Sequence, residues 1–215
     1  QRGVLRSDKI EENEPFGLEY LVDDCENIRN ILGINSWSIM GHSFGGMLAL
    51  LYATQYPKSV EKVIFESPSF NFLMSMRSVY LKSAEILQKQ GKFDYANELR
   101  KFADNNNELK LLTDNIRQIP IEVRGEVYHN GGTLEEVRLI NSPIDVTEQQ
   151  WEIGKIHFDR LLSEGKINQN FIPLLSALQC ASILILGQYD PICCREQQEC
   201  YLKNSMNSKI ITFDK

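Results

Sequence analysis

The chain has 215 residues, of which 42% are hydrophobic and 24% charged, and its mean hydropathy is −0.30. This composition is typical of a soluble globular domain with a sizeable core, and it excludes intrinsic disorder, a collagen-like repeat and a disulfide-dense miniprotein. The net charge of −6 and the lack of any long apolar run argue against nucleic-acid and membrane partners.

The five cysteines favour a cytoplasmic protein with reduced thiols. Their number is odd, whereas a secreted disulfide framework is normally even and denser. Cys193, Cys194 and Cys200 lie close in sequence, but they form no C-x-x-C pair and have no histidine nearby. We therefore expect buried thiols on a helix there and no metal site.

Helices and strands alternate in the first part of the chain. Apolar residues at helical spacing predict an amphipathic helix over 17–32, which Gly33 ends. A short buried strand is predicted over 36–40, a helix over 44–55 and a second strand over 62–66. This order is typical of a parallel sheet with crossover helices.

The pattern changes after the second strand. No strand is predicted between residues 67 and 170, where helical patterns occupy 79–90, 95–103, 109–119 and 148–162 and the segment 104–108 is interpreted as a loop. Strands over 182–186 and 209–213, with a helix over 195–204, then restore the sheet pattern. We therefore predict an α/β core over 1–67 and 171–215 and a helical cap over 68–170.

The segment Gly41-His42-Ser43-Phe44-Gly45-Gly46 has the clearest chemical meaning. It is a G-x-S-x-G motif between a predicted strand and a predicted helix, the context in which this motif forms a nucleophile elbow. So sharp a turn strains the backbone, and glycines are expected where flanking side chains would clash. Ser43 Oγ would then lie at the tip of the turn, and the N–H of Phe44 would be an oxyanion donor.

Two other interpretations of this segment are a tightly packed structural turn and a phosphate-binding loop. Met47 stands where a Walker-type loop needs lysine followed by serine or threonine, and no G-x-G-x-x-G sequence is present. A nucleotide-binding domain is therefore disfavoured.

The sequence resembles the α/β-hydrolase superfamily, and within it the proline-iminopeptidase-related group. Segment 1–7 is similar to the family loop D-x-R-G-x-G-x-S, although Leu5 replaces one glycine, and 21–37 is similar to D-x-E-x-x-R-x-x-L-G-I-x-x-W. The elbow and 183–191, a strand followed by a G-x-x-D acid loop, complete the resemblance. It implies a mostly parallel sheet, a helical cap and a Ser-His-Asp triad that needs neither cofactor nor metal. It also implies that the first strands and the last part of the fold lie outside residues 1–215.

Asp190 is the expected triad acid, because it follows a predicted strand at the carboxyl edge of the sheet. A turn or N-cap aspartate is the alternative interpretation, and Glu66 is the second candidate acid. His42 adjoins the nucleophile as a supporting residue, whereas His129 and His157 precede Asp190, against the family order of serine, acid and histidine.

We expect the triad histidine just after residue 215 and the second oxyanion donor before residue 1. The sequence Asn130-Gly131-Gly132 imitates an oxyanion turn, but it follows the nucleophile and is interpreted as a connection between helices.

These features predict a serine hydrolase that acts by acyl transfer on a small ester, an amide or an N-terminal peptide bond, as a proline iminopeptidase does. A carboxylesterase or lipase-like enzyme is the first alternative. A non-catalytic binding protein is the second, if the chain truly lacks a triad histidine. The expected partner is a small molecule or short peptide, and a homo-oligomer is left open.

Two sets of side chains in the predicted cap could contact such a substrate. Carboxylates that could hold a substrate ammonium group are Glu122, Glu126, Glu135, Glu136, Glu148 and Glu164. Candidates for an apolar acyl pocket are Met74, Tyr80, Phe93, Tyr95 and Phe102. Solvated helix faces explain the carboxylates equally well, and packing within the cap is the better explanation for most of the apolar set.

Overall fold

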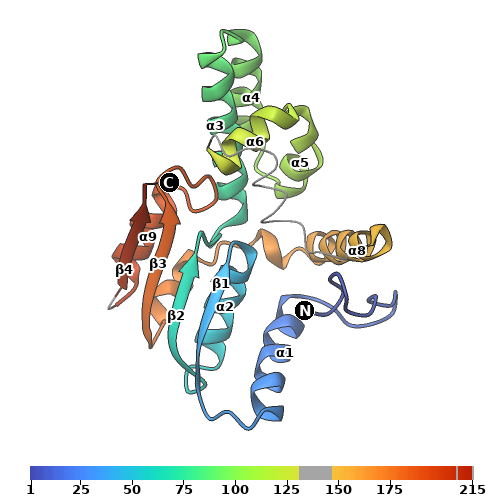
Figure 1. Cartoon of the computed structure of the whole chain (residues 1–215), viewed down its shortest axis with the longest axis vertical. Coiled ribbons are helices and arrows are strands. Elements are labelled where there is room, and N and C mark those ends of the chain that lie inside the picture. Colours follow the sequence, from blue (N-terminus) through green and yellow to red (C-terminus); the bar gives the residue numbers. More distant parts are fainter. Residues whose placement is uncertain (131–146, 207, 215) are drawn as a thin grey trace.

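Four parallel strands are the centre of the structure, a computed structural model that describes residues 1–130, 147–206 and 208–214 (Figure 1). They are β1 (Trp37–His42), β2 (Val60–Glu66), β3 (Ala181–Gly187) and β4 (Ser208–Phe213), and they pair in that order. β2 and β3 pair directly, with Ile64 opposite Ile183, although the whole helical region separates them in the chain. Because all four strands run in the same direction, their carboxyl ends meet at one edge of the sheet.

Helices α2 (Phe44–Gln55) and α9 (Arg195–Asn204) pack on one face of this sheet, and α1 (Leu18–Ile31) packs beside α2. Trp37 of β1 donates a hydrogen bond of 3.0 Å to the Tyr52 hydroxyl of α2. Tyr201 of α9 lies edge-on to Phe65 of β2, with 5.9 Å between the ring centroids. These aromatic contacts fix two helices that each begin near the carboxyl edge of the sheet.

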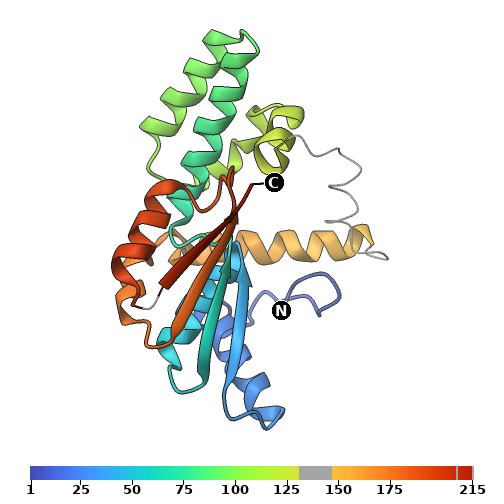
Figure 2. The ribbon, with the colours of Figure 1, turned by 60° about the vertical axis from the view of Figure 1, so that its left-hand side comes forward.

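A helical region occupies most of the chain between β2 and β3. Its elements are α3 (Phe72–Lys89), α4 (Phe93–Asn105), α5 (Leu109–Asp114), η1 (Ile116–Gln118), α6 (Ile121–His129), α8 (Glu148–Glu164), η2 (Lys166–Asn168) and η3 (Ile172–Ala177). Helices α3 to α6 stand beyond the carboxyl edge of the sheet, whereas α8 lies beside the N-terminal segment (Figure 2). No helix in the described part of the chain is long and apolar enough to span a bilayer.

An ion pair between Arg2 and Asp24 joins the two N-terminal segments that resemble family motifs. Arg2 binds the carboxylate of Asp24 through two nitrogens, with Nε 2.7 Å from Oδ2, and its Nη1 lies 3.2 Å from Glu14 Oε1. Glu26 accepts hydrogen bonds from Arg29 at 2.9 Å and from the Tyr52 hydroxyl at 2.8 Å. The bond from Arg29 is the main reason that the pKa of Glu26 falls to about 2. These residues stabilise the fold around the sheet.

Most predicted elements are present, and two predicted helices, 44–55 and 195–204, coincide with α2 and α9. The helix expected from residue 79 begins earlier, at Phe72, because the Asn71 side chain caps it by accepting a bond of 3.1 Å from the Met74 N–H. The helix expected over 109–119 ends at Asp114 and continues as the short turn η1. The sequence did not predict α6 or η3.

The paired cysteines also depart from expectation. Cys193 and Cys194 are buried but precede α9 instead of lying on it, and Cys194 is the N-cap residue of that helix. All five cysteines of the chain are free thiols.

Candidate active site

Ser43 lies in the turn between β1 and α2, with φ 51° and ψ −116°. A side chain at positive φ strains the backbone, so surrounding contacts must hold this conformation. The Ser43 N–H donates to Glu66 O at 2.9 Å, and the Ser43 carbonyl accepts from the N–H groups of Gly46 at 2.9 Å and Ser69 at 3.2 Å. The turn is therefore fixed to the end of β2 and to the segment that follows it.

Two glycines of the motif are sterically required. A Cβ atom on Gly41 would lie 2.2 Å from the Gly45 carbonyl oxygen, and one on Gly46 would lie 2.6 Å from Pro68 Cβ. A Cβ on Gly45 would meet nothing within 4 Å. The expectation that glycines flank the serine for steric reasons holds at Gly41 but is wrong at Gly45, because the close approach occurs one residue later, where α2 passes Pro68.

The side chain of Ser43 is half-buried, and within the described residues its Oγ makes no hydrogen bond. Phe44 is the first residue of α2, so its N–H has no acceptor inside the helix. Adjacent residues at the carboxyl edge thus carry a hydroxyl and an N–H that both lack a partner among the described residues, the local arrangement expected of a nucleophile with an oxyanion donor.

Asp190 lies in the loop that follows β3, which we call the acid loop (residues 187–194). Its Oδ1 accepts bonds from the N–H groups of Ile192 at 2.6 Å and Cys193 at 3.0 Å, the contacts of a turn aspartate. Its Oδ2 is buried and has no partner among the described residues. One oxygen therefore shapes the loop, and the other is available to a further donor.

Ser43 and Asp190 follow strands that are separated only by β2. Two steps of the usual strand spacing put the ends of β1 and β3 about 10 Å apart. Glu66, the second candidate acid, ends the intervening strand, and its Oε2 lies 3.4 Å from His42 Nδ1.

The three histidines have separate surroundings, and within the described residues none bonds to Ser43. His42 is 68% exposed and pairs with Glu66. His157 is buried on α8, edge-on to Phe16 with 4.9 Å between centroids, and burial lowers its pKa. His129 ends α6, and Gly131 and Gly132 of the sequence after it lie outside the described residues.

A hollow of about 700 Å³ opens between α3, the acid loop and the start of α9. Asp190 lines it together with Glu85 and Glu196, whereas Ser43 does not. Of the predicted apolar set only Met74 lines it, while Tyr80 and Phe102 pack on each other at 5.3 Å inside the helical region.

The carboxylates chosen from the sequence lie elsewhere. Glu122, Glu126 and Glu148 are exposed, Glu164 pairs with Lys166 at 3.1 Å, and Glu135 and Glu136 lie outside the described residues. Sequence reasoning missed Glu85 and Glu196, since no local pattern marks which acidic residue of a helix faces a distant loop.

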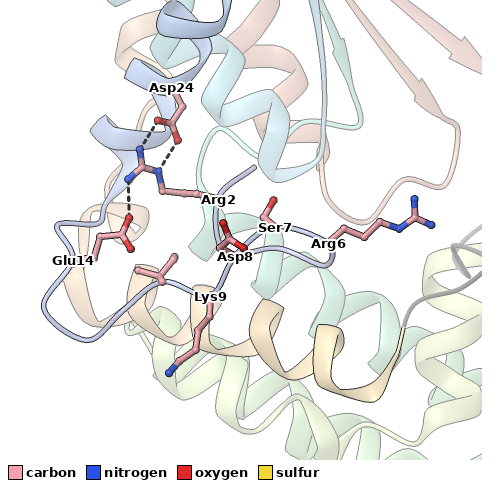
Figure 3. A pocket seen from close by; sticks show the side chains of 8 residues that line it. Arg2, Arg6, Ser7, Asp8, Lys9, Glu14 and Asp24 are labelled. Atoms are coloured by element: carbon pink, nitrogen blue, oxygen red, sulfur yellow. Dashed lines mark hydrogen bonds and ion pairs between the residues drawn. The ribbon is translucent and has the colours of Figure 1, made fainter.

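A second hollow, of about 490 Å³, lies under the N-terminal segment. Figure 3 shows Arg2 pointing to Asp24 and Glu14 in its wall, with Lys9 directed away from that cluster. The polar groups in the wall of this hollow are explained by the ion pairs of Arg2, which have a structural role.

Comparison with known proteins shows what the sequence is similar to. The sequence profile of the alpha/beta hydrolase fold matches residues 1–124. A Mycoplasma genitalium protein provisionally named a proline iminopeptidase is 26% identical, and the match covers 90% of this chain and 66% of that protein. Mouse epoxide hydrolase 4 is 37% identical over 71 residues, 32% of this chain and 20% of that enzyme. The chain thus spans less than two thirds of the length of these curated relatives.

A solved structure extends the similarity to nearly the whole of this chain. The crystal structure of a proline iminopeptidase-related protein from Thermus thermophilus superposes with a TM-score of 0.67, covering 99% of this chain and 68% of that one. At 18% identity the similarity establishes the fold and leaves the chemistry to the residues of the site.

Proposed function

The chain belongs to the α/β-hydrolase fold family, and from this membership we propose that it is a serine hydrolase in which Ser43 is the nucleophile and Asp190 the triad acid. The observation that carries the proposal is the strained turn at Ser43, with its unbonded hydroxyl beside the free N–H of Phe44. Such strain has little structural use, and it is found where a serine must be presented at the top of a sheet.

In the proposed mechanism Ser43 Oγ attacks the carbonyl carbon of the substrate while a histidine takes its proton. Asp190 Oδ2 holds that imidazole in the tautomer that accepts the proton. The Phe44 N–H stabilises the tetrahedral oxyanion, a contact worth about 3 kcal/mol. The imidazolium then protonates the leaving alcohol or amine, and water releases the acyl group from Ser43 by the same steps.

We place the histidine outside residues 1–215, following β4. Support comes from the carboxyl end of β4, where Phe213 O accepts a bond of 2.8 Å from the N–H of Gln188 in the acid loop. A histidine that follows β4 closely would therefore lie at the same edge as Asp190 and Ser43. The exposed His42 and the buried His157 are less suitable, because neither bonds to Ser43 or Asp190 within the described part of the chain.

The test is covalent labelling of the intact protein, as its own gene encodes it, with a fluorophosphonate, read by mass spectrometry. We expect one adduct, which Ser43→Ala abolishes. Ser67→Ala is the matched control, because Ser67 follows β2 at the same edge and also has a positive φ of 43°. No adduct on the wild type would favour the non-catalytic binding protein, and an adduct lost only in Ser67→Ala would assign the nucleophile to Ser67.

For the substrate we propose a small peptide or amide with a free N-terminal amino group, as the proline iminopeptidase relatives suggest. The carboxylates of Glu85 and Glu196, which line the hollow with Asp190, are the candidates to hold the ammonium group. Hydrolysis of small esters is the alternative, since the same triad would serve both. For the location of the protein we propose the cytoplasm, because its five cysteines are free thiols.

Removing the carboxylate charges of Glu85 and Glu196 should affect hydrolysis of these two kinds of substrate differently. If Glu85 and Glu196 bind an ammonium group, Glu85→Gln and Glu196→Gln should raise KM for prolyl-p-nitroanilide about tenfold or more, by the usual strength of such a contact, and leave p-nitrophenyl acetate unaffected. Glu98→Gln, on α4 and exposed, is the control. Equal effects on both substrates, or none, would favour the esterase.

A further inference from the structure

Helix α3 holds the acid loop from the side of the helical region. The Lys82 ammonium group donates to the backbone carbonyls of Tyr189 at 2.7 Å and Asp190 at 2.8 Å. Two turns earlier on the same helix, Ser75 Oγ donates to Ile192 O at 2.7 Å. Because positions seven residues apart share a helix face, one face of α3 binds three carbonyl groups of the acid loop.

The first turn of α3 is itself fixed by Gln197 of α9, which is fully buried. Its Oε1 accepts from the N–H groups of Phe70 at 2.8 Å and Asn71 at 2.9 Å. Its Nε2 donates to Ser75 Oγ and to Ile192 O, both at 2.9 Å. One amide therefore connects α9, the start of α3 and the acid loop.

Lys82 is half-buried at this junction and has no carboxylate within ion-pairing distance in the described residues. Burial lowers its pKa, and the charge of Asp190 opposes that shift. Taking an ammonium group out of water carries a desolvation cost, which the two carbonyl contacts must offset. They can do so only where the backbone of the acid loop stays within hydrogen-bond distance of Lys82.

We propose that Lys82 is a positioning residue that fixes Asp190 through its backbone and so links the placement of α3 to the reactivity of Ser43. This inference rests on the proposed function. The carboxylate of Asp190 has one oxygen bonded within the loop, and the other has no partner among the described residues, so the direction of the carboxylate depends on where the loop backbone lies. A triad carboxylate displaced by about 1 Å would no longer align the imidazole, and such a displacement can cost up to about 100-fold in rate.

The experiment measures the rate at which a fluorophosphonate labels Ser43 in the intact protein. Lys82→Met keeps the apolar stem and removes the donors, Lys82→Arg restores donors, and Lys89→Met makes the same change at an exposed site on α3. We expect Lys82→Met to slow labelling about tenfold or more, Lys82→Arg to recover most of the rate, and Lys89→Met to have no effect. A small probe is used because its reaction does not depend on the rest of the hollow.

The same change in an Asp190→Asn background separates positioning from general damage. If Lys82 acts through Asp190, Lys82→Met should slow labelling of Asp190→Asn by less than about twofold, since the two changes remove the same contribution. Equal slowing in both backgrounds would overturn the inference.

Amide hydrogen exchange gives a readout that does not need activity. The N–H groups of Ile192 and Cys193 bond to Asp190 Oδ1, and we expect their exchange to accelerate about fivefold or more in Lys82→Met but not in Lys89→Met. Unchanged exchange would overturn the inference whatever the labelling shows. If the wild type does not label while exchange accelerates as expected, the hydrolase proposal fails, whereas the role of Lys82 in holding the loop stands.

Discussion

The strained backbone at Ser43 predicts that glycine stabilises the protein at this position. With φ 51° and ψ −116°, any side chain there costs about 1–3 kcal/mol. Glycine removes that cost but adds about 0.4–1 kcal/mol of unfolded-state entropy. Alanine keeps the strain, and it breaks no hydrogen bond, because Ser43 Oγ makes none within the described residues. We therefore expect Ser43→Gly to be about 1 kcal/mol more stable than Ser43→Ala, and Ser43→Ala to match the wild type.

Urea denaturation of the three proteins measures the difference directly, and thermal unfolding should show a shift of about 2–4 °C for a chain of this size. Gln169 is the matched control site, since it is exposed and has ordinary extended angles of φ −71° and ψ 153°. There Gln169→Gly should be less stable than Gln169→Ala by about 0.4–1 kcal/mol, so the order of the two variants reverses.

The result that refutes this reasoning is a Ser43→Gly variant no more stable than Ser43→Ala. The contacts to Glu66, Gly46 and Ser69 would then not be holding a strained turn, and the argument that connects its strain to function would fail with it. The comparison needs no substrate and is independent of the proposed chemistry.

Two further predictions concern packing and pH. Gly46→Ala should lower the free energy of unfolding by about 1–3 kcal/mol, because the new Cβ meets Pro68. Gly45→Ala should raise it by about 0.5–1 kcal/mol, because alanine has the higher helix propensity. Equal effects of the two variants in urea denaturation would contradict the close contact between Gly46 and Pro68. The depressed pKa of Glu26, about 2 against an ordinary 4.5, means that its ionised carboxylate stabilises the fold above pH 4.5 and that this contribution is lost as the pH falls towards 2. Urea titrations should therefore show a stability gap between the wild type and Glu26→Gln that narrows over this range, and a gap independent of pH would count against the ion pair with Arg29.

Local patterns in the sequence predicted the elements that local physics determines. The density of Leu, Ala and Met and the following Pro57 sufficed for α2, and the elbow could be predicted because its strand, turn and helix adjoin one another in the chain. The start of α3 was missed because its cap is a single hydrogen bond, which the Asn71 side chain accepts from the Met74 N–H. The steric need for Gly46 could not be predicted either, since it depends on Pro68 of the next crossover.

The contacts that orient the candidate acid depend on residues far apart in sequence, and the topology explains why they meet. β2 and β3 are neighbours in the sheet, so the segment between them must leave and return at adjacent strands. It leaves β2 at the carboxyl edge, where the acid loop also begins, and α3 therefore starts beside that loop. Any helix inserted at this crossover gains access to the backbone around Asp190. The helical region is thus placed to hold the candidate acid, and the Lys82 contacts are one way in which this chain uses that position.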